Sequence, residues 1–222
     1  FWGIGVHNVT VTGGGYIFGD NLSTGTTQPG DGNKMFAIRS SQHIELNNIH
    51  LVRGGWFTVI ITDVDFFTMV DTEIEAIRDG IDICQCRHVR VNRAHIHNGG
   101  DDALVIKSDY STGMPKPSYD HIYSNSIIGS PGASALRFGS ETVGEIYDFL
   151  WENITITEAA KAAIGVVSMD GAHIRDIVYR NITATGTGIP LFFYIGARNR
   201  RPAAPGNKPH LGSIKRITVE SF

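Results

Sequence analysis

The stretch "RHVRVNRAHIHN", residues 87–98, alternates apolar and polar side chains, breaks at an Asn-Arg pair and then alternates again. Two earlier stretches have the same form, "QHIELNNIHLV" at 42–52 and "VDFFTMVDTEIEAI" at 64–77. Alternation with period two is typical of strands, whereas helical periodicity is almost absent. A unit that recurs along the chain indicates a solenoid, in which each repeat buries its apolar face against its neighbours.

The spacing of the repeats predicts the size of one coil. The best-matched apolar positions, Ile44, Phe66 and Val89, are 22 and 23 residues apart. Three later anchors follow at longer intervals, as if loops were inserted: Ile122, Phe149 and Ile177. A sandwich has no reason to repeat a sequence unit, and the Leu/Asn consensus of leucine-rich repeats is absent.

We therefore expect an all-β fold, a right-handed parallel β-helix of about eight coils that forms a single domain over 1–222. Both ends are strand-like, so the helix is expected to be incomplete at each end. Five asparagines recur near the expected bends, where Asn tolerates left-handed backbone. These are Asn8, Asn48, Asn125, Asn153 and Asn181.

Composition narrows the class of protein. The 222 residues contain 41% hydrophobic residues, which is globular, and 19 Lys+Arg against 22 Asp+Glu, which argues against a nucleic-acid partner. No apolar stretch is long enough to span a membrane. Cys84 and Cys86 would lie too far apart along one strand for a comfortable disulfide and lack the further ligands of a zinc site, so we interpret them as small side chains of a wall or surface.

Paired acids are the strongest chemical signal. "RDGIDICQC" carries Asp79, and "GGDDALVIKSD" carries Asp101 and Asp102. An isolated Asp-Asp pair is usually a turn feature. Asp101 follows Asp79 by 22 residues, however, which is one coil, so stacking should bring three carboxylates together on one outer surface. Crowded carboxylates hold a proton more tightly, and an acid beside a base is what glycosidic cleavage requires.

The order of these segments resembles glycoside hydrolase family 28, the polygalacturonases and rhamnogalacturonan hydrolases. That family shows a Trp-bearing strand, then N-T-D-G-I-D, G-D-D-C-I-A-I-K-S-G, G-H-G-x-x-I-G-S-E, R-I-K and a late Tyr. The matching segments here are "GGWFTVII", "IRDGIDI", "GGDDALVIKSD", "ASALRFGSE", "AIGVVSMDG" and "IPLFFYIG". The opening "NVTVTGGGYIFGDN" is also similar to the family's early glycine-rich segment.

The resemblance implies roles for the acids. Asp101 corresponds to the general acid, and Asp79 and Asp102 to the residues that hold and deprotonate the attacking water. Asp82, within the same motif, is interpreted as structural. The family inverts at the anomeric carbon, so the acid and the base should be roughly 6.5–9.5 Å apart, and its chemistry needs no metal or other cofactor.

Two departures from the family pattern bear on the substrate. Ser134 stands where the family has the His of G-H-G. The R-I-K motif, whose cations hold a galacturonate carboxylate, aligns with Gly165, Val166 and Val167. Loss of both cations argues against plain polygalacturonan.

Five residues are candidates for substrate binding, each with a structural alternative. Arg137 is either a carboxylate fork or outward packing, and Lys107 either reaches the site or is a solvated strand end. Tyr194 and Trp56 (with its neighbour Phe57) either contact a sugar or fill the interior. His97 either substitutes for the missing His or is simply solvated.

The sequence thus predicts an inverting, metal-independent hydrolase of a pectin-like polysaccharide, a monomer acting outside the cell or in the periplasm. No nucleic acid, membrane or cofactor is expected as a partner. Two alternatives stay open: a Ca²⁺-dependent polysaccharide lyase on the same scaffold, and a carbohydrate-binding β-helix without activity.

Overall fold

A computed structural model of the protein describes residues 1–25, 32–198 and 211–222, and in these residues every regular element is a strand. None of the described residues forms a helix long and apolar enough to cross a membrane. The strands are β1 (Trp2–Ile4), β2 (His7–Thr12), β3 (Tyr16–Phe18), β4 (Lys34–Asn47), β5 (His50–Val52), β6 (Phe57–Val70), β7 (Glu73–Ala76), β8 (Asp79–Cys84), β9 (Arg87–Asn92), β10 (His95–Asn98), β11 (Leu104–Ser108), β12 (Ser118–Ser130), β13 (Leu136–Thr142), β14 (Ile146–Ser168), β15 (His173–Ala184), β16 (Thr187–Ile195) and β17 (Ser213–Glu220).

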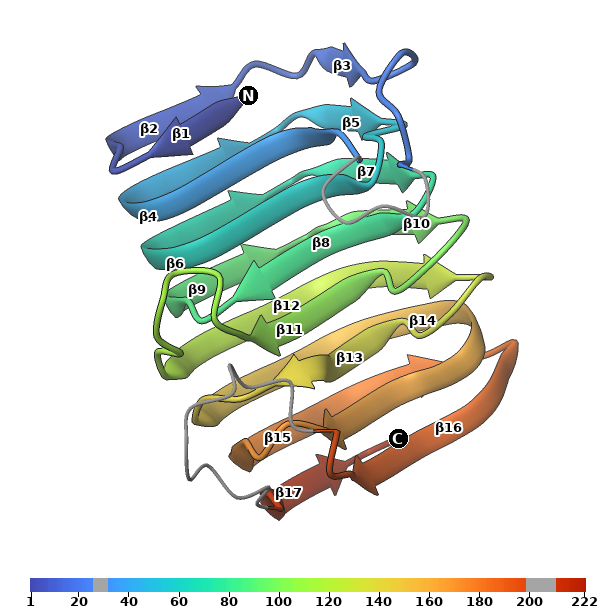
Figure 1. The fold of residues 1–222 in the computed structure, drawn as a ribbon. Coiled ribbons are helices and arrows are strands. Elements are labelled where there is room, and N and C mark those ends of the chain that lie inside the picture. The colour runs from blue at the N-terminus through green and yellow to red at the C-terminus, as the bar shows by residue number, and fades with distance from the viewer. Residues whose placement is uncertain (26–31, 199–210) are drawn as a thin grey trace.

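The strands wind into a parallel β-helix, as the repeat predicts (Figure 1). All the pairings between the named strands are parallel, and each joins a strand to its counterpart one coil further along the chain. One row of strands, which we call the groove face, runs through β1, β4, β6, β8, β11, β13, the end of β14 and β16. The described residues therefore form eight coils, in agreement with the expected number.

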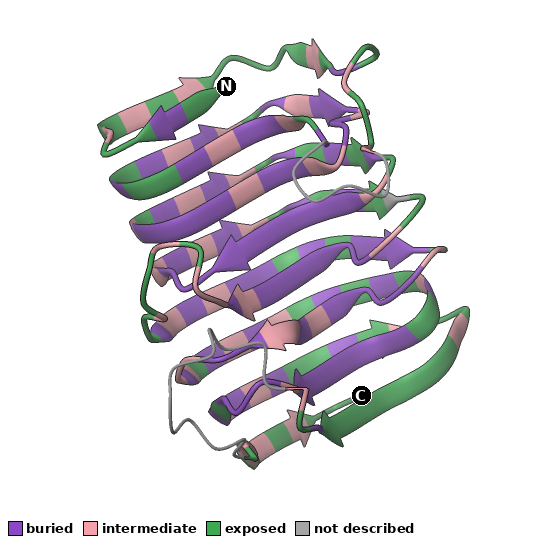
Figure 2. Cartoon of the chain, in the orientation of Figure 1, coloured by how far each residue is buried: buried purple, intermediate pink, exposed green. Residues whose placement is uncertain are grey.

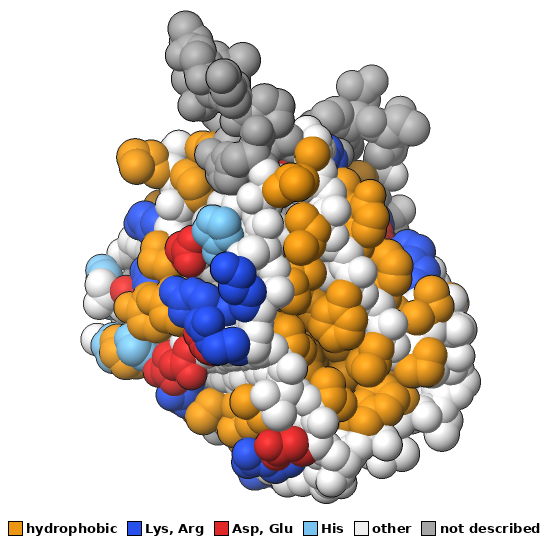
Figure 3. Space-filling model, turned by 90° about the horizontal axis from the view of Figure 1, so that it is seen from below, with side chains coloured by type: hydrophobic (Ala, Val, Ile, Leu, Met, Phe, Trp, Pro, Cys, Tyr) orange, Lys and Arg blue, Asp and Glu red, His pale blue; other side chains and the backbone are white. Residues whose placement is uncertain are grey.

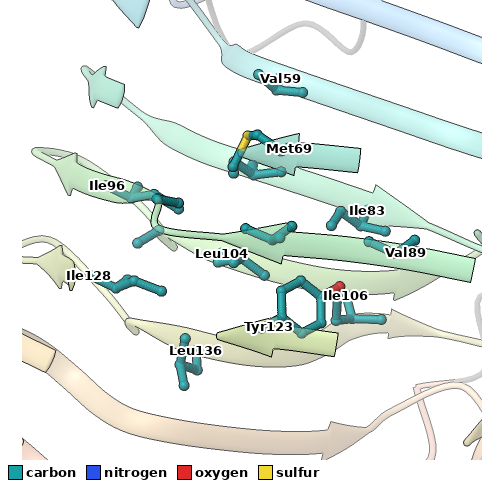
Figure 4. Close-up of a cluster of buried hydrophobic side chains, with 14 of the residues drawn as sticks. Val59, Met69, Ile83, Val89, Ile96, Leu104, Ile106, Tyr123, Ile128 and Leu136 are labelled. Carbon is teal, nitrogen blue, oxygen red and sulfur yellow. The ribbon is translucent and has the colours of Figure 1, made fainter. Parts of the chain in front are cut away.

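A continuous apolar core fills the helix because equivalent residues of successive coils lie in register. On the groove face Val59 pairs with Ile81, Ile81 with Leu104, and Leu104 with Leu136. All four side chains are fully buried. Figure 2 shows buried and exposed positions alternating along many strands, and Figure 4 shows the apolar side chains of neighbouring coils stacked inside. Each such side chain contributes about 1.5–3 kcal/mol when it leaves water.

The bends use left-handed backbone at two recurring positions of the coil, with Asn8 at one of them and the other four asparagines at the other. The five asparagines predicted there have φ between 50° and 56°. Three of them also bond along the helix axis: Asn153 donates its amide to Asn125 (3.1 Å), and Asn181 donates to Asn153 (2.8 Å). The short polar side chain therefore both permits the bend and ties one coil to the next.

Two of the predicted anchors are wrong by one residue. Phe67 pairs with Ile44 and Val89 in the core, whereas Phe66 occupies the bend with φ of 60° and is 45% exposed. Likewise His121, rather than Ile122, pairs with Val89. Period-two alternation cannot fix the register when a left-handed bend residue adjoins the strand, because a slip of one residue exchanges the two faces.

Apolar side chains gather at the end of the helix formed by the last coil (Figure 3). Several of them lie on β16 and are 37–50% exposed: Ile189, Leu191, Phe192, Phe193, Tyr194 and Ile195.

The insertion between β11 and β12 lies beside the coils. It is held there by Lys116, whose Nζ is 2.6 Å from Asp63 Oδ2.

Candidate active site

A polar cleft of about 410 Å³ opens on the groove face over β6, β8, β11 and β13. It contains all three acids that the sequence singles out, together with aromatic and basic side chains. Its lining is Trp56, Phe57, Arg78, Asp79, Asp101, Asp102, Lys107, Arg137, Gly139, Ser140, Glu141 and Lys161. The stacking predicted from the spacing of Asp79 and Asp101 therefore does bring these residues to one place.

Gly80 explains how closely the two acidic segments approach. Its N–H donates to the carbonyl of Asp102 at 3.2 Å, so the first residues of β8 lie directly against the segment that precedes β11. A side chain at Gly80 would collide with the backbone carbonyl of Ala103. Glycine after Asp79 is thus required for two carboxylate-bearing coils to stack here.

Asp79 and Asp82 form the buried floor of the cleft with Lys107. The Lys107 ammonium lies 2.5 Å from Asp82 Oδ2 and 3.7 Å from Asp79 Oδ2. The side chains of Asp82 and Asp79 are 1% and 5% exposed, so they have little water to stabilise their charge. Lys107, predicted to bind substrate, mainly neutralises this floor while still lining the cleft.

Asp102 is held by groups from the next coil. Its Oδ1 accepts the backbone N–H of Ser134 at 3.0 Å, and its Oδ2 lies 3.3 Å from Arg137 Nε. Arg137 also donates to the Ser134 hydroxyl at 3.3 Å. The residue at the position of the missing family His, together with Arg137, therefore fixes the orientation of Asp102.

Asp101 is the most exposed of the three acids, with 31% of its side chain accessible. It lies 3.1 Å from Arg78 Nη2, and Nη1 of the same guanidinium is 3.4 Å from Asp79 Oδ1. The plane of this guanidinium covers Trp56, 3.9 Å from the centre of its ring. Arg78 therefore links Asp79, Asp101 and the aromatic wall of the cleft.

Burial separates the protonation behaviour of the acids. It raises the pKa of Asp79 to about 8, with further contributions from the Asp82 and Asp101 charges, against which Lys107 and Arg78 act. Burial also raises the pKa of Asp102, although Arg137 opposes it. Burial lowers the pKa of Lys107, but the charges of Asp82 and Asp79 outweigh it and hold that pKa above its usual value. The floor therefore retains a proton on Asp79 at neutral pH beside a charged lysine.

Glu141 lines the same cleft. Its carboxylate is 3.9 Å from Lys107 and 3.5 Å from Arg198. Arg198 in turn forms a 2.6 Å ion pair with the fully buried Asp170 and donates to the carbonyl of Ser140 at 2.7 Å. The segment that presents Ser140 and Glu141 is thus braced from the following coils.

Two predicted binding residues lie outside the cleft. Tyr194 is on β16, two coils beyond Arg137, where its ring stacks on Phe192 with 6.2 Å between the centroids. His97 is on β10, with 59% of its side chain exposed and Nδ1 4.0 Å from Glu158. Neither belongs to the lining, whereas Trp56 does.

Sequence reasoning missed Arg78, Glu141 and Lys161 as cleft residues. Arg78 directly precedes the DGID motif, and Glu141 ends the "GSE" of the segment compared with the family, so both had a signal in their position. Lys161 had none, because no motif surrounds it. It is exposed and forms no ion pair with the residues that the structure describes.

Other potential sites are limited in the described ranges. No group of three or more His, Cys, Asp or Glu residues there is arranged to hold a metal ion. Cys84 and Cys86 are buried and unpaired, in agreement with the wall role predicted for them.

A sequence model of the family described as glycosyl hydrolases family 28 matches residues 3–195. No curated protein matches the chain. Among solved structures, a hyperthermoactive exopolygalacturonase from Thermotoga maritima is similar with a TM-score of 0.66 and 16% identity, over 86% of this chain and 55% of that one. A polygalacturonase from Erwinia carotovora ssp. carotovora gives 0.62 and 17%, over 98% and 69%.

A third similar structure is the catalytic domain of a GH87 α-1,3-glucanase in complex with nigerose. Its TM-score is 0.56 and its identity 13%, over 87% of this chain and 48% of that one. The chain thus spans about half the length of two of these three structures. At such identities the likeness shows the parallel β-helix alone.

Proposed function

The chain belongs to glycosyl hydrolases family 28, and on that premise we propose that its cleft hydrolyses a pectin-like polysaccharide with inversion and without a metal. The observation that carries this proposal is the environment of Asp79, Asp101 and Asp102. Three carboxylates from neighbouring coils line one open cleft, and each lies beside at least one cationic side chain. Folding alone gives no reason to crowd acids in this way, whereas glycosidic cleavage needs one acid and one base.

The exposed carboxyl of Asp101 is our candidate for the general acid. It reaches into the open cleft, where a leaving oxygen would lie, and Arg78 fixes its position. Asp79 and Asp102 would then hold the attacking water from the floor and from the following coil. Inversion requires the acid and the base to be far enough apart for a water molecule to attack the sugar. The guanidinium of Arg78 lies between Asp101 and Asp79 and holds their carboxylates apart.

One observation favours the opposite assignment, with Asp79 as the general acid and Asp101 as the base. A pKa of about 8 leaves Asp79 protonated at neutral pH, and a protonated carboxyl is an acid rather than a base. The two assignments are separable with a substrate whose leaving group needs no proton. An asparagine at the true acid position leaves cleavage of such an activated glycoside intact, whereas an asparagine at the base position abolishes it.

An acidic sugar suits the charges of the cleft. Arg78, Arg137 and Lys161 line it together with the mostly buried Lys107, although no R-I-K segment is present. Lys161 is exposed and forms no ion pair within the described part of the chain, so it can contact a carboxylate of a bound polymer. The printed names of two similar structures, both polygalacturonases, point to the same class of substrate.

A substrate screen tests the proposal. The purified protein is incubated with polygalacturonate, rhamnogalacturonan and α-1,3-glucan, with and without EDTA, and both reducing ends and ultraviolet absorbance are followed. We expect new reducing ends from a pectic polymer, no unsaturated product and no effect of EDTA. An absorbing product that requires Ca²⁺ would indicate a lyase instead. Binding of the polymer without any cleavage would indicate a carbohydrate-binding protein.

The setting of this activity follows from its substrate. A plant cell-wall polymer does not enter cells, so we expect the protein to act extracellularly or in the periplasm. We also expect a monomer. Size-exclusion chromatography with light scattering checks the oligomeric state.

A further inference from the structure

Arg78 occupies the position where the family motif N-T-D-G-I-D has threonine. The substitution replaces a small hydroxyl by a permanently charged fork directly beside Asp79 in the cleft. The same chain has lost the two cations of R-I-K, since Gly165 and Val167 stand in their places. A cation has therefore been gained within the cleft in a chain that lacks the usual pair.

The guanidinium is fixed on three sides. It lies 3.9 Å from the centre of the Trp56 ring and contacts Asp101 and Asp79 at 3.1 and 3.4 Å. Trp56 in turn packs so closely on Gly25 and Gly32 that a Cβ at either position would overlap its side chain. Arg78 therefore holds one geometry at the wall of the cleft, with 31% of its side chain accessible.

The stacking of Arg78 on Trp56 has a consequence for sugars. A neutral sugar ring binds an aromatic side chain through its face, and here the guanidinium covers that face. An anionic sugar meets a different surface, because arginine has five N–H donors and contacts the two carboxylates with only some of them. The cleft wall thus offers a cation where an uncovered tryptophan would offer an apolar platform.

Two other cations of the cleft, Lys107 and Arg137, are less suited to this role, and Lys161 is not next to the acids in any ion pair of the described residues. Lys107 and Arg137 are bound to Asp82 and Asp102, with 17% and 20% of their side chains exposed. Arg78 is more accessible than either of them and adjoins two of the proposed catalytic acids. The lining holds four acidic and four basic side chains, so removal of Arg78 leaves an excess of acids.

We propose that Arg78 is a specificity-determining residue of the cleft: it binds the carboxylate of a uronic sugar next to Asp101 and denies the Trp56 face to a neutral sugar ring. This inference rests on the proposed function and names the group that selects its substrate class.

The test compares substrates that differ only in charge. A (1→4)-linked galacturonate trimer and its methyl ester are offered to the wild type, Arg78→Thr and Arg78→Lys, with Arg93→Thr as a matched control. Arg93 is an exposed arginine whose partner is Asp71, outside the cleft. We expect the ratio of kcat/KM for acid over ester to fall at least tenfold in Arg78→Thr and less in Arg78→Lys. The ratio stays unchanged in the control.

Turnover of the ester separates specificity from a structural role. Because Arg78 also contacts Asp101 and Asp79, Arg78→Thr lowers kcat on both trimers, and charge selection is the additional loss of at least tenfold in kcat/KM on the acid. An equal loss on both trimers, or an unchanged ratio, overturns the proposal.

A binding measurement distinguishes this inference from the proposed hydrolysis. Calorimetry with both trimers is performed in an Asp102→Asn background, which leaves the Arg78–Asp101 contact in place. Tighter binding of the acid that disappears with Arg78→Thr supports charge selection even if the wild type cleaves neither trimer. Equal affinities for acid and ester with Arg78 present contradict it whether or not hydrolysis is observed.

Discussion

Aspartates of one coil form ion pairs with basic side chains of a neighbouring coil in two regions, the outer bends and the cleft. The pKa of the aspartate shifts in opposite directions in the two regions. At the outer bends, Arg93 lies 2.6 Å from Asp71, and Arg216 lies 2.5 Å from Asp176. These side chains are 38–61% exposed, and the bonds from arginine lower the pKa of each aspartate, that of Asp176 to about 2. In the cleft the same stacking buries Asp79, and its pKa rises to about 8.

The difference lies in solvent and in charge balance. Each bend aspartate lies beside at least one arginine and remains hydrated, so its charged form is favoured. On the floor of the cleft, Asp79 and Asp82 share Lys107 and have little contact with water. Charged side chains thus stack in both regions of this solenoid, whereas only the cleft buries more acids than cations on its floor, and this burial raises the pKa of Asp79.

Loss of a single cleft acid should have the largest effect. We expect Asp101→Asn to lower kcat on a pectic oligosaccharide by about 10²–10⁴-fold, the usual contribution of a general acid. The same change at the bend, Asp71→Asn, should leave kcat unchanged. Initial rates of reducing-end release on both variants check this, and comparable losses in the two would erase the distinction between the regions.

Removal of the shared cation should mainly affect stability. Lys107→Met leaves Asp82 buried without its partner, which typically costs about 3–5 kcal/mol. Adding Asp82→Asn should recover most of that loss because no buried charge then remains. Urea unfolding gives the free energy of unfolding of the single and double variants. Arg93→Met serves as the control, because it removes the cation of an exposed ion pair. A double variant no more stable than Lys107→Met would disprove the pairing.

The two regions should respond to pH with opposite signs. Asp79 has a raised pKa in the folded state, so its contribution to stability is full below the unfolded value of 3.8 and is lost as the pH rises through about 8. Asp79→Asn should therefore gain on the order of 5 kcal/mol over the wild type between pH 4 and pH 9.

Asp176 has a lowered pKa, so its contribution is present above pH 3.8 and is lost as the pH falls through about 2. Asp176→Asn should thus differ from the wild type above pH 4 and converge with it in acid. Melting temperatures of both variants across this range give the slopes. A flat difference between Asp79→Asn and the wild type would show that Asp79 is ionised throughout.

The smallest effect concerns Lys161, the exposed lysine of the cleft. Its contact with a substrate carboxylate would be solvated, and such a contact is worth about 0.5–1 kcal/mol. Lys161→Gln should therefore raise KM for an acidic oligosaccharide about two- to fivefold and leave kcat in place. Steady-state kinetics at low and high salt check this, since screening should shrink the difference.

Much of this arrangement could be predicted from the sequence. The repeat gives the β-helix and its coils, and the interval of 22 residues from Asp79 to Asp101 gives the acid cluster. Both follow from geometry, because residues one coil apart become neighbours. The register within a strand is less predictable. The sequence predicts Phe66 in the core, but Phe67 lies there, because alternation does not reveal which residue takes the left-handed bend.

The partners of the acids could not be predicted in the same way. Arg78 and Lys161 enter the cleft through side-chain direction, which spacing alone does not give. Motif order predicts a sugar contact for Tyr194, yet each further coil moves a residue along the helix axis, and Tyr194 lies two coils beyond Arg137. His97 lies on another row of strands, on β10, so its closeness to Asp101 in the chain does not bring it to the cleft lining.

The most direct test of the account is time-resolved proton NMR of a pectic α-linked oligosaccharide mixed with the protein. We predict that the β-anomer of the new reducing end appears first and then mutarotates, and that Asp101→Asn produces neither signal. An α-anomer as the first product, or an unsaturated product, would contradict inverting hydrolysis by these three carboxylates.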